Sequence, residues 1–333
     1  MSRVRGPRRL RRLERGALLA AAVTALSLTA SGCVVVHGER EVLPAATRAE
    51  AATALRQFTD AYNKADKAYD SSLDAGHVTG ALGAIDAARL KAGHANHPGG
   101  NPAHTDLTLT DVTYTIPKKA GWPRWFLADA KGNKGGTARW LLVFTRTGPG
   151  ASWQVAYLTL VAPGTVPRFT RDQDGWAQAV PAGSADLAAA PGGLSQEYAA
   201  YLKSGGKTFA DGPHTSDWRA QRAHDGSRPG LATQYIDEPL AGGAYPPVAL
   251  RTEDGGALVF FATHHYQKQT AAEGTSVPAP NADVRALTKG EIKQSLTMEF
   301  VSTEVALDPV RGASGGRVSV LGRVQGLTSA QGG

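Results

Sequence analysis

The sequence has 333 residues and a formal net charge of +7, a basic balance that often accompanies binding to nucleic acid or to anionic membranes. That charge is concentrated at the N-terminus, where residues 1–15 hold seven arginines and one glutamate. The rest of the chain carries 29 basic and 28 acidic residues, which argues against nucleic acid as a partner. The single cysteine excludes an intramolecular disulfide, so apolar packing has to stabilise the fold.

Residues 1–32 have the order of a secretory signal peptide. An arginine-rich start is followed by the uncharged segment 16–32, which is dominated by Ala and Leu and ends in small residues. This segment is shorter and less apolar than the roughly 20 residues that a membrane-spanning helix needs. We therefore predict export and cleavage, by the general secretory route or, given Arg8-Arg9 and Arg11-Arg12, by the twin-arginine route.

The signal peptide ends in Leu28-Thr29-Ala30-Ser31-Gly32-Cys33, which resembles the bacterial lipoprotein box. The resemblance implies that the Cys33 thiol is lipidated and that cleavage leaves this cysteine as the new N-terminus. Acyl chains such as palmitate would then anchor the protein to the outer face of the cytoplasmic membrane, in the cell envelope. The alternative is an ordinary cleavage site at Ala30-x-Gly32, which would release a secreted protein with a free thiol.

The first half of the mature chain is predicted to be a module of helices followed by an antiparallel meander, residues 46–165, held by a tether at 33–45. Leu55, Phe58, Tyr62, Ala65 and Tyr69 follow the spacing of one helical face. A second helix is predicted at 78–90. Strands are predicted at 107–116, 122–128, 140–147 and 153–161, separated by short Gly-rich turns.

A second module is predicted at residues 194–327, after a Pro-, Gly- and Ala-rich connector at 166–193. It opens with a helix at 194–202 and a long loop to about residue 229. The predicted strands are 232–236, 247–252, 257–266, 295–306 and 317–325, and residues 328–333 are expected to be a disordered tail. The predicted class is therefore α+β. The two halves share a faint sequence match around Trp122-Pro123 and Tyr245-Pro246, which fits either a duplication or two unrelated hairpins.

Four segments of the chain carry a family resemblance: 122–126, 141–146, 212–215 and 257–263. They resemble an uncharacterised family of actinobacterial lipoproteins of the Streptomyces type. That family has no known activity, so the resemblance implies no functional residue. The helix-plus-meander order is also similar to NTF2-like and cystatin-like α+β modules, a likeness of architecture that does not fix function.

Several motifs suggest chemistry but lack its structural context. Residues 312–316 have the letters of a nucleophile elbow but lie between two strands, and residues 205–208 lack the first glycine of a phosphate loop. His94, His97 and His104 have no further ligands nearby for a zinc site. His264 and His265 would point to opposite faces of a strand. We therefore predict no catalytic residue, no metal site and no cofactor.

The candidate ligand-binding residues are Trp122, Trp125, Tyr245 and His214. Large aromatics on such a sheet either fill the core or line a pocket. The first hypothesis is a membrane-anchored, non-enzymatic protein that binds a small ligand or an envelope protein. The alternatives are a cell-envelope hydrolase that uses the loop between His214 and His224, and an assembly or maturation factor for envelope proteins.

Overall fold

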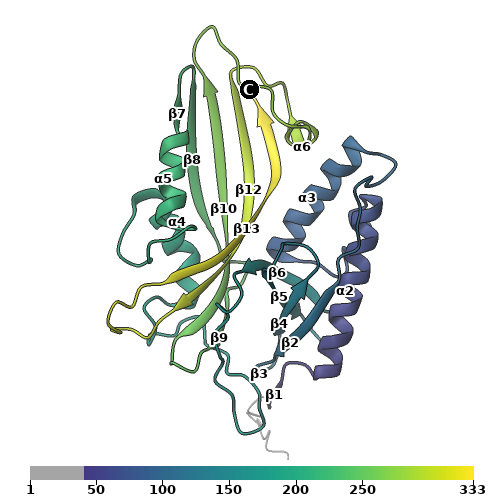
Figure 1. Ribbon diagram of the computed structural model, residues 1–333, viewed down its shortest axis with the longest axis vertical. Helices are drawn as coiled ribbons and strands as arrows, with labels where there is room; N and C mark the ends of the chain where they lie inside the picture. The colour runs from purple at the N-terminus through teal and green to yellow at the C-terminus, as the bar shows by residue number, and fades with distance from the viewer. Residues whose placement is uncertain (1–40) are drawn as a thin grey trace, which may run out of the picture. The chain divides into compact units, whose positions relative to one another are not determined.

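Two large sheets, a two-stranded sheet and the helices against them make up the described part of the chain, residues 41–333 of the computed structural model (Figure 1). The signal peptide, Cys33 and most of the predicted tether lie outside these residues. The α+β class is confirmed. Residues 42–333 form one unit by their contacts, and the predicted partition of this unit into two modules stays a prediction.

The smaller sheet has four strands in the order β2-β4-β5-β6, all antiparallel. The strands are β2 (Leu109–Thr115), β4 (Arg124–Gly132), β5 (Arg139–Arg146) and β6 (Gln154–Val161). They lie where alternating β-forming residues predicted them. In the register, Phe126 faces Phe144 across the β4–β5 pair, so aromatic side chains stack on one face.

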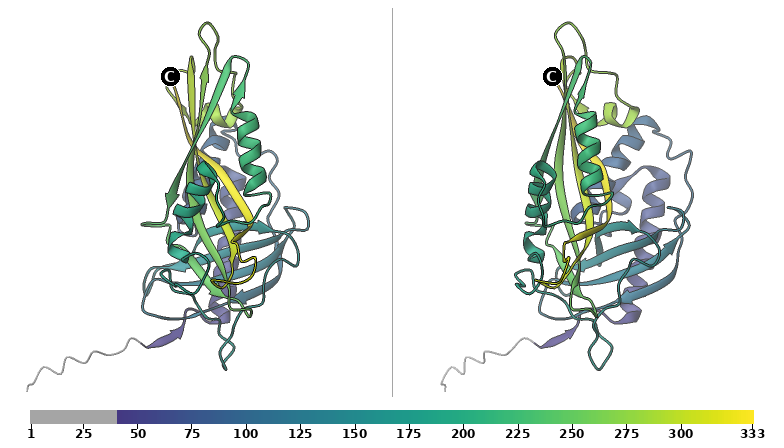
Figure 2. Two further views of the ribbon diagram at one scale, coloured as in Figure 1. Left: turned by 90° about the vertical axis from the view of Figure 1, so that its left-hand side faces the viewer. Right: turned by 60° about the vertical axis from the view of Figure 1, so that its left-hand side comes forward.

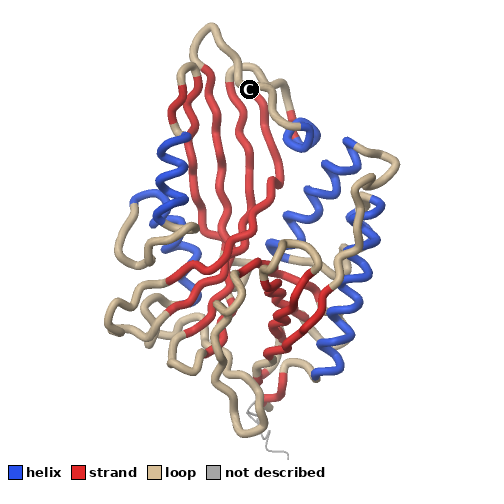
Figure 3. Tube along the Cα trace, in the orientation of Figure 1, coloured by secondary structure: helices blue, strands red, loops and turns tan. Residues whose placement is uncertain are grey.

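The larger sheet has the order β11-β13-β12-β10-β8-β7, and β9 pairs with β10. Its strands are β7 (Ser227–Arg228), β8 (Leu231–Leu240), β9 (Val248–Arg251), β10 (Ala257–Ala271), β11 (Thr288–Lys289), β12 (Ser295–Asp308) and β13 (Ser319–Gly332). Strands β8, β10, β12 and β13 are neighbours in this order and extend well beyond the smaller sheet (Figure 3). Each of them continues past its predicted end, because the residues added there include polar ones that weaken the strand pattern.

The expectation of a disordered tail at 328–333 is wrong. Strand β13 continues to Gly332, and the backbone N–H of Gly333 donates to the Ser295 carbonyl at 3.0 Å. Ala330 is buried in a small apolar cluster with Leu296 and Met298, which gives the segment a partner that its composition does not reveal.

The predicted tether also ends earlier than expected. Strand β1 (Val42–Pro44) pairs with β3 (Lys118–Ala120) in a two-stranded sheet. Ala45 follows it fully buried. The last residues assigned to the tether, 42–45, therefore belong to the folded body.

Helix α2 (Arg48–Ala68) begins at a capping box, in which Thr47 and Glu50 satisfy each other's backbone N–H groups. Its predicted apolar face covers one side of the smaller sheet, and Phe58 lies against Phe144. Helix α3 (Gly80–Asn96) extends past the predicted end and contacts β6, β12 and β13. Two short 3-10 turns, Ser71–Leu73 and Pro191–Gly193, precede α3 and α4.

The predicted helix at 194–202 is confirmed as α4 (Leu194–Ser204). The prediction of a long loop after it is wrong in part, because this segment contains α5 (Ser216–Asp225). A further short helix, α6 (Ala282–Leu287), was not predicted. Both α4 and α5 lie on one face of the larger sheet (Figure 2). None of the helices within residues 41–333 has the length and apolarity to span a bilayer.

The two sheets share one apolar core. Leu127 and Val143 of the smaller sheet meet Phe260 of the larger sheet, all three without solvent exposure. The opposite face of the smaller sheet packs against α2, and the opposite face of the larger sheet packs against α4. This layering places both faces of β4 and β5 in apolar surroundings, which their continuous hydrophobic runs require.

Candidate functional site

A cavity of about 160 Å³ opens where the smaller sheet meets the segment between β8 and β9. Strands β4, β5 and β6, the start of α3 and the loop at 241–247 all contribute to it. Its lining residues are Thr79, Pro123, Arg124, Trp125, Thr145, Thr147, Gln154, Ala156, Tyr157, Gly243, Ala244, Pro246 and Val248.

The aromatic wall of the cavity comes from Trp125 and Tyr157, which are 5% and 1% exposed. The Tyr157 hydroxyl donates a hydrogen bond to the Pro246 carbonyl at 3.0 Å. Burial raises the pKa of Tyr157 far above its usual value, so the hydroxyl stays a neutral donor. This bond ties the loop at 241–247 to the sheet and keeps the cavity closed on that side.

The same loop packs against the first residue of α3. Gly80 has a φ of +54°, and a Cβ at this position would lie 2.7 Å from the Ala244 carbonyl oxygen. Only glycine allows this approach without displacing backbone. The sequence therefore needs a glycine here for the loop to close the cavity.

A stack of alternating arginine and tryptophan side chains borders the cavity. The guanidinium groups of Arg124 and Arg146 lie 4.7 and 5.0 Å from the Trp122 ring centroid. Arg146 also lies 4.9 Å from the Trp153 ring centroid, between two indoles. The Nε atoms of Arg124 and Arg146 are buried without a hydrogen-bond partner among the described residues. This rim places two guanidinium groups beside an apolar space, and Arg146 Nη1 also lies 3.8 Å from Glu50 Oε1.

The lining of this cavity is mostly apolar. Among residues 41–333, Arg124 is the one charged residue in the lining, and no Asp, Glu or His lines the cavity. A space of about 160 Å³ matches the apolar cavities that hold a benzene-sized group.

Three of the four predicted ligand-binding residues meet at this place. Trp125 lines the cavity, Trp122 adjoins the lining Pro123, and Tyr245 lies between the lining residues Ala244 and Pro246. Tyr157 was not among the predicted residues, and of the loop at 241–247 only Tyr245 was. No sequence signal joins them, because Tyr157 and Pro246 are 89 positions apart.

His214 lies elsewhere, just before α5. Its carbonyl oxygen accepts a hydrogen bond from the Tyr198 hydroxyl, and burial, with Arg323 nearby, lowers the pKa of its imidazole. His224 is exposed on the last turn of α5. Within residues 41–333, no hydrogen bond joins either imidazole to a carboxylate, a serine or each other.

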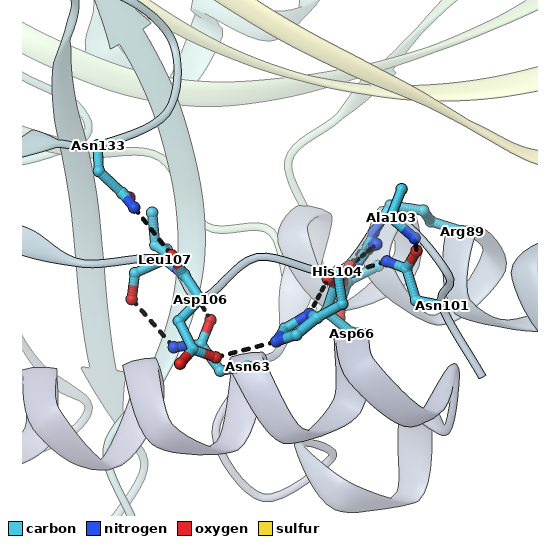
Figure 4. A network of polar contacts seen from close by, with 10 residues as sticks. Asn63, Asp66, Arg89, Asn101, Ala103, His104, Asp106, Leu107 and Asn133 are labelled. Carbon is cyan, nitrogen blue, oxygen red and sulfur yellow. Dashed lines mark hydrogen bonds and ion pairs between the residues drawn. The ribbon is translucent and has the colours of Figure 1, made fainter.

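His104 belongs to a network between α2, α3 and the segment that precedes β2 (Figure 4). Its Nδ1 lies 2.7 Å from Asp66 and its Nε2 lies 2.9 Å from Asp106. These hydrogen bonds raise the pKa of His104 and occupy both ring nitrogens. Asp66 also pairs with Arg89 of α3, so the network fastens the two helices together. No group of three His, Cys, Asp or Glu in the described part of the chain is arranged to hold a metal.

His264 and His265 lie on opposite faces of β10, as strand geometry requires. His264 Nε2 lies 2.7 Å from Glu299, whereas His265 is buried and stacks on Phe300 at 4.8 Å. The glycine-rich segment at 312–316 lies in the turn between β12 and β13, as predicted. It therefore lacks the strand-to-helix geometry of a nucleophile elbow.

A family model described as "Domain of unknown function (DUF8094)" matches residues 42–332. The chain is 73% identical over 332 residues to "Uncharacterized lipoprotein SCO2278" of Streptomyces coelicolor, and the match covers 100% of both chains. It is 59% identical over 332 residues to an "Uncharacterized lipoprotein" of Streptomyces avermitilis, again over 100% of both.

A more distant relative, "Uncharacterized lipoprotein SCO6871" of Streptomyces coelicolor, is 27% identical over 216 residues, which are 61% of this chain and 59% of that protein. The predicted resemblance to uncharacterised Streptomyces lipoproteins is confirmed. No solved structure matches the chain, so the likeness to NTF2-like and cystatin-like modules stays a prediction.

Proposed function

The chain belongs to the family described as "Domain of unknown function (DUF8094)", and we propose that it is a lipid-anchored cell-envelope protein whose body binds a ligand without transforming it. The observation that carries this proposal is the apolar cavity beside Arg124, which is lined by no acidic or histidine residue of the described part of the chain. The ligand would present a benzene-sized apolar group to the cavity and a negative charge to the arginine–tryptophan rim.

The anchor rests on Cys33 and on the names of two relatives that match the chain over its whole length. Replacing Cys33 by Ala should leave the protein unprocessed or release it from the membrane fraction. Ser31→Ala is the matched control, because a small residue at that position keeps the lipoprotein box. Membrane retention and normal mass in Cys33→Ala would refute the anchor.

Binding at the cavity is tested with benzene and phenylacetate as probes and the full-length protein in detergent micelles. Ala156 lines the cavity and is 2% exposed, so Ala156→Leu should fill the cavity and abolish binding of both probes. Ala223→Leu, on the exposed surface of α5, is the matched control.

Arg124→Gln separates the two parts of the proposed ligand. It should weaken phenylacetate at least tenfold and leave benzene unchanged, because only the carboxylate interacts with the guanidinium group. Calorimetry or ligand-observed NMR measures both affinities. Failure of both probes to bind, or binding that survives Ala156→Leu, would contradict the proposal.

The hydrolase alternative has less support. It needs a nucleophile activated by a histidine, and the described hydrogen bonds give neither His214 nor His224 such a partner. A role in envelope assembly or maturation stays a prediction. Crosslinking of the membrane-anchored protein in cells, followed by identification of the captured chains, would test it.

A further inference from the structure

Polar side chains gather on the face of the larger sheet that α5 covers. Asp237 of β8 lies opposite His265 of β10, and Glu304 of β12 lies opposite Arg323 of β13. Ser302 precedes Glu304 by two positions and therefore points to the same face. A sheet face buried under a helix is normally apolar, because burying polar groups costs free energy unless they are hydrogen-bonded or paired.

Arg222 of α5 points into this cluster and is 6% exposed. Its Nη1 lies 2.8 Å from both carboxylate oxygens of Asp237. Its Nε and Nη2 atoms are buried and have no hydrogen-bond partner among residues 41–333. These two atoms form the side edge of the guanidinium group, the pair of parallel donors that best fits a carboxylate or phosphate.

Arg323 brings a second guanidinium group close to the first. It lies 4.0 Å from the Trp218 ring centroid, and Arg222 lies 4.7 Å from the same centroid. The two guanidinium carbons are therefore within about 9 Å of each other. The hydrogen bonds described for residues 41–333 include none made by the Arg323 side chain.

Other buried polar atoms on this face also have no partner in the described structure: Trp218 Nε1, Ser302 Oγ and Glu304 Oε2. Buried polar groups are nearly always hydrogen-bonded, so several such atoms on one face indicate a missing partner. Most of the free groups are donors. The missing partner should therefore be an acceptor.

The charges of the buried cluster also favour an anionic partner. Burial raises the pKa of Glu304 to about 8 and lowers the pKa of His265 to about 3, so both are neutral at pH 7. Within residues 41–333, the Asp237 carboxylate is then the one buried anion that faces the two arginines. An added anion would offset the remaining positive charge.

We propose that Arg222, Arg323 and Trp218 form a binding site for a small oxyanion, a carboxylate or a phosphate, between α5 and the larger sheet. The free edge of Arg222 and the Trp218 N–H would donate to its oxygens, with Arg323 completing the charge. This site is separate from the cavity at Trp125 and does not depend on the function proposed there.

The experiment measures the melting temperature of the full-length protein in detergent with sodium phosphate, sodium acetate or sodium chloride at equal ionic strength. We expect a saturable rise of about 3 °C at ten times the dissociation constant in phosphate, acetate or both, and none in chloride. The stronger of the two responses identifies the chemistry of the oxyanion. Equal melting temperatures in all three salts would overturn the proposal.

Arg323→Gln should weaken the anion at least tenfold, because it removes one of the two guanidinium groups. Arg228→Gln, at an exposed arginine paired with Asp225, should leave the response unchanged. Arg222→Met with Asp237→Leu removes both buried charges together, which avoids an uncompensated carboxylate, and should also abolish the response. An unchanged response in either cluster variant would overturn the proposal as well.

Discussion

Two glycines of α3, three positions apart, should respond in opposite directions to the same replacement. At Gly80, Ala would have to adopt a φ of +54°, which costs about 1–2 kcal/mol, and its Cβ would lie 2.7 Å from the Ala244 carbonyl oxygen. Displacing that backbone adds about 1–3 kcal/mol. We therefore expect Gly80→Ala to lower the free energy of unfolding by about 2–5 kcal/mol.

At Gly83 the added Cβ would meet only ordinary contacts, the nearest at 3.5 Å from the Val78 carbonyl carbon. Gly83→Ala should therefore raise the free energy of unfolding by about 0.5–1 kcal/mol, because alanine loses less backbone entropy in a helix. Urea denaturation of the full-length protein measures both values. Gly80→Ala should also weaken benzene binding, since it displaces the loop at 241–247. A Gly80→Ala protein as stable as the unmodified protein would refute the close contact between α3 and this loop.

Two further replacements test the core and the buried acid. Phe144→Ala should cost about 3–5 kcal/mol of unfolding free energy in urea, because Phe144 is fully buried, 4.7 Å from the Phe126 ring centroid. Glu304 binds a proton in the folded state between its ordinary pKa of 4.5 and its raised pKa of about 8, so it makes stability fall as the pH rises through that window. Glu304→Gln should flatten this part of the pH dependence between pH 5 and pH 8, and an unchanged profile would contradict the raised pKa.

The strands of the smaller sheet could be predicted because their apolar runs are bounded by glycine-rich turns. Helix α5 could not, because the side chains it turns toward the sheet include Trp218 and Arg222, an aromatic and a charged residue. A periodicity search looks for apolar residues on a helical face and fails where that face binds a carboxylate. The buried arginine on this face explains why the helix was not predicted, and it also makes the helix chemically unusual.

The candidate cavity could be predicted only in part. Trp125 and Tyr245 could be predicted as ligand-binding residues because they are large aromatics in or beside strands. Ala156 and Gly80 could not, because nothing in the sequence around them indicates a binding site. Their importance comes from the close approach of segments far apart in the sequence. Loop closure of this kind depends on tertiary packing, which residue patterns within one segment do not contain.

The ordered end of β13 bears on how the protein can be labelled. The N–H groups of Gln294 and Ser295 both donate to the Gly333 carbonyl, so a tag fused directly after this residue would begin inside the sheet. The turn between β12 and β13 offers a better position. A Cβ at Gly312 or Gly315 would meet nothing within 4 Å, and an epitope inserted there would extend from the hairpin without disturbing either strand.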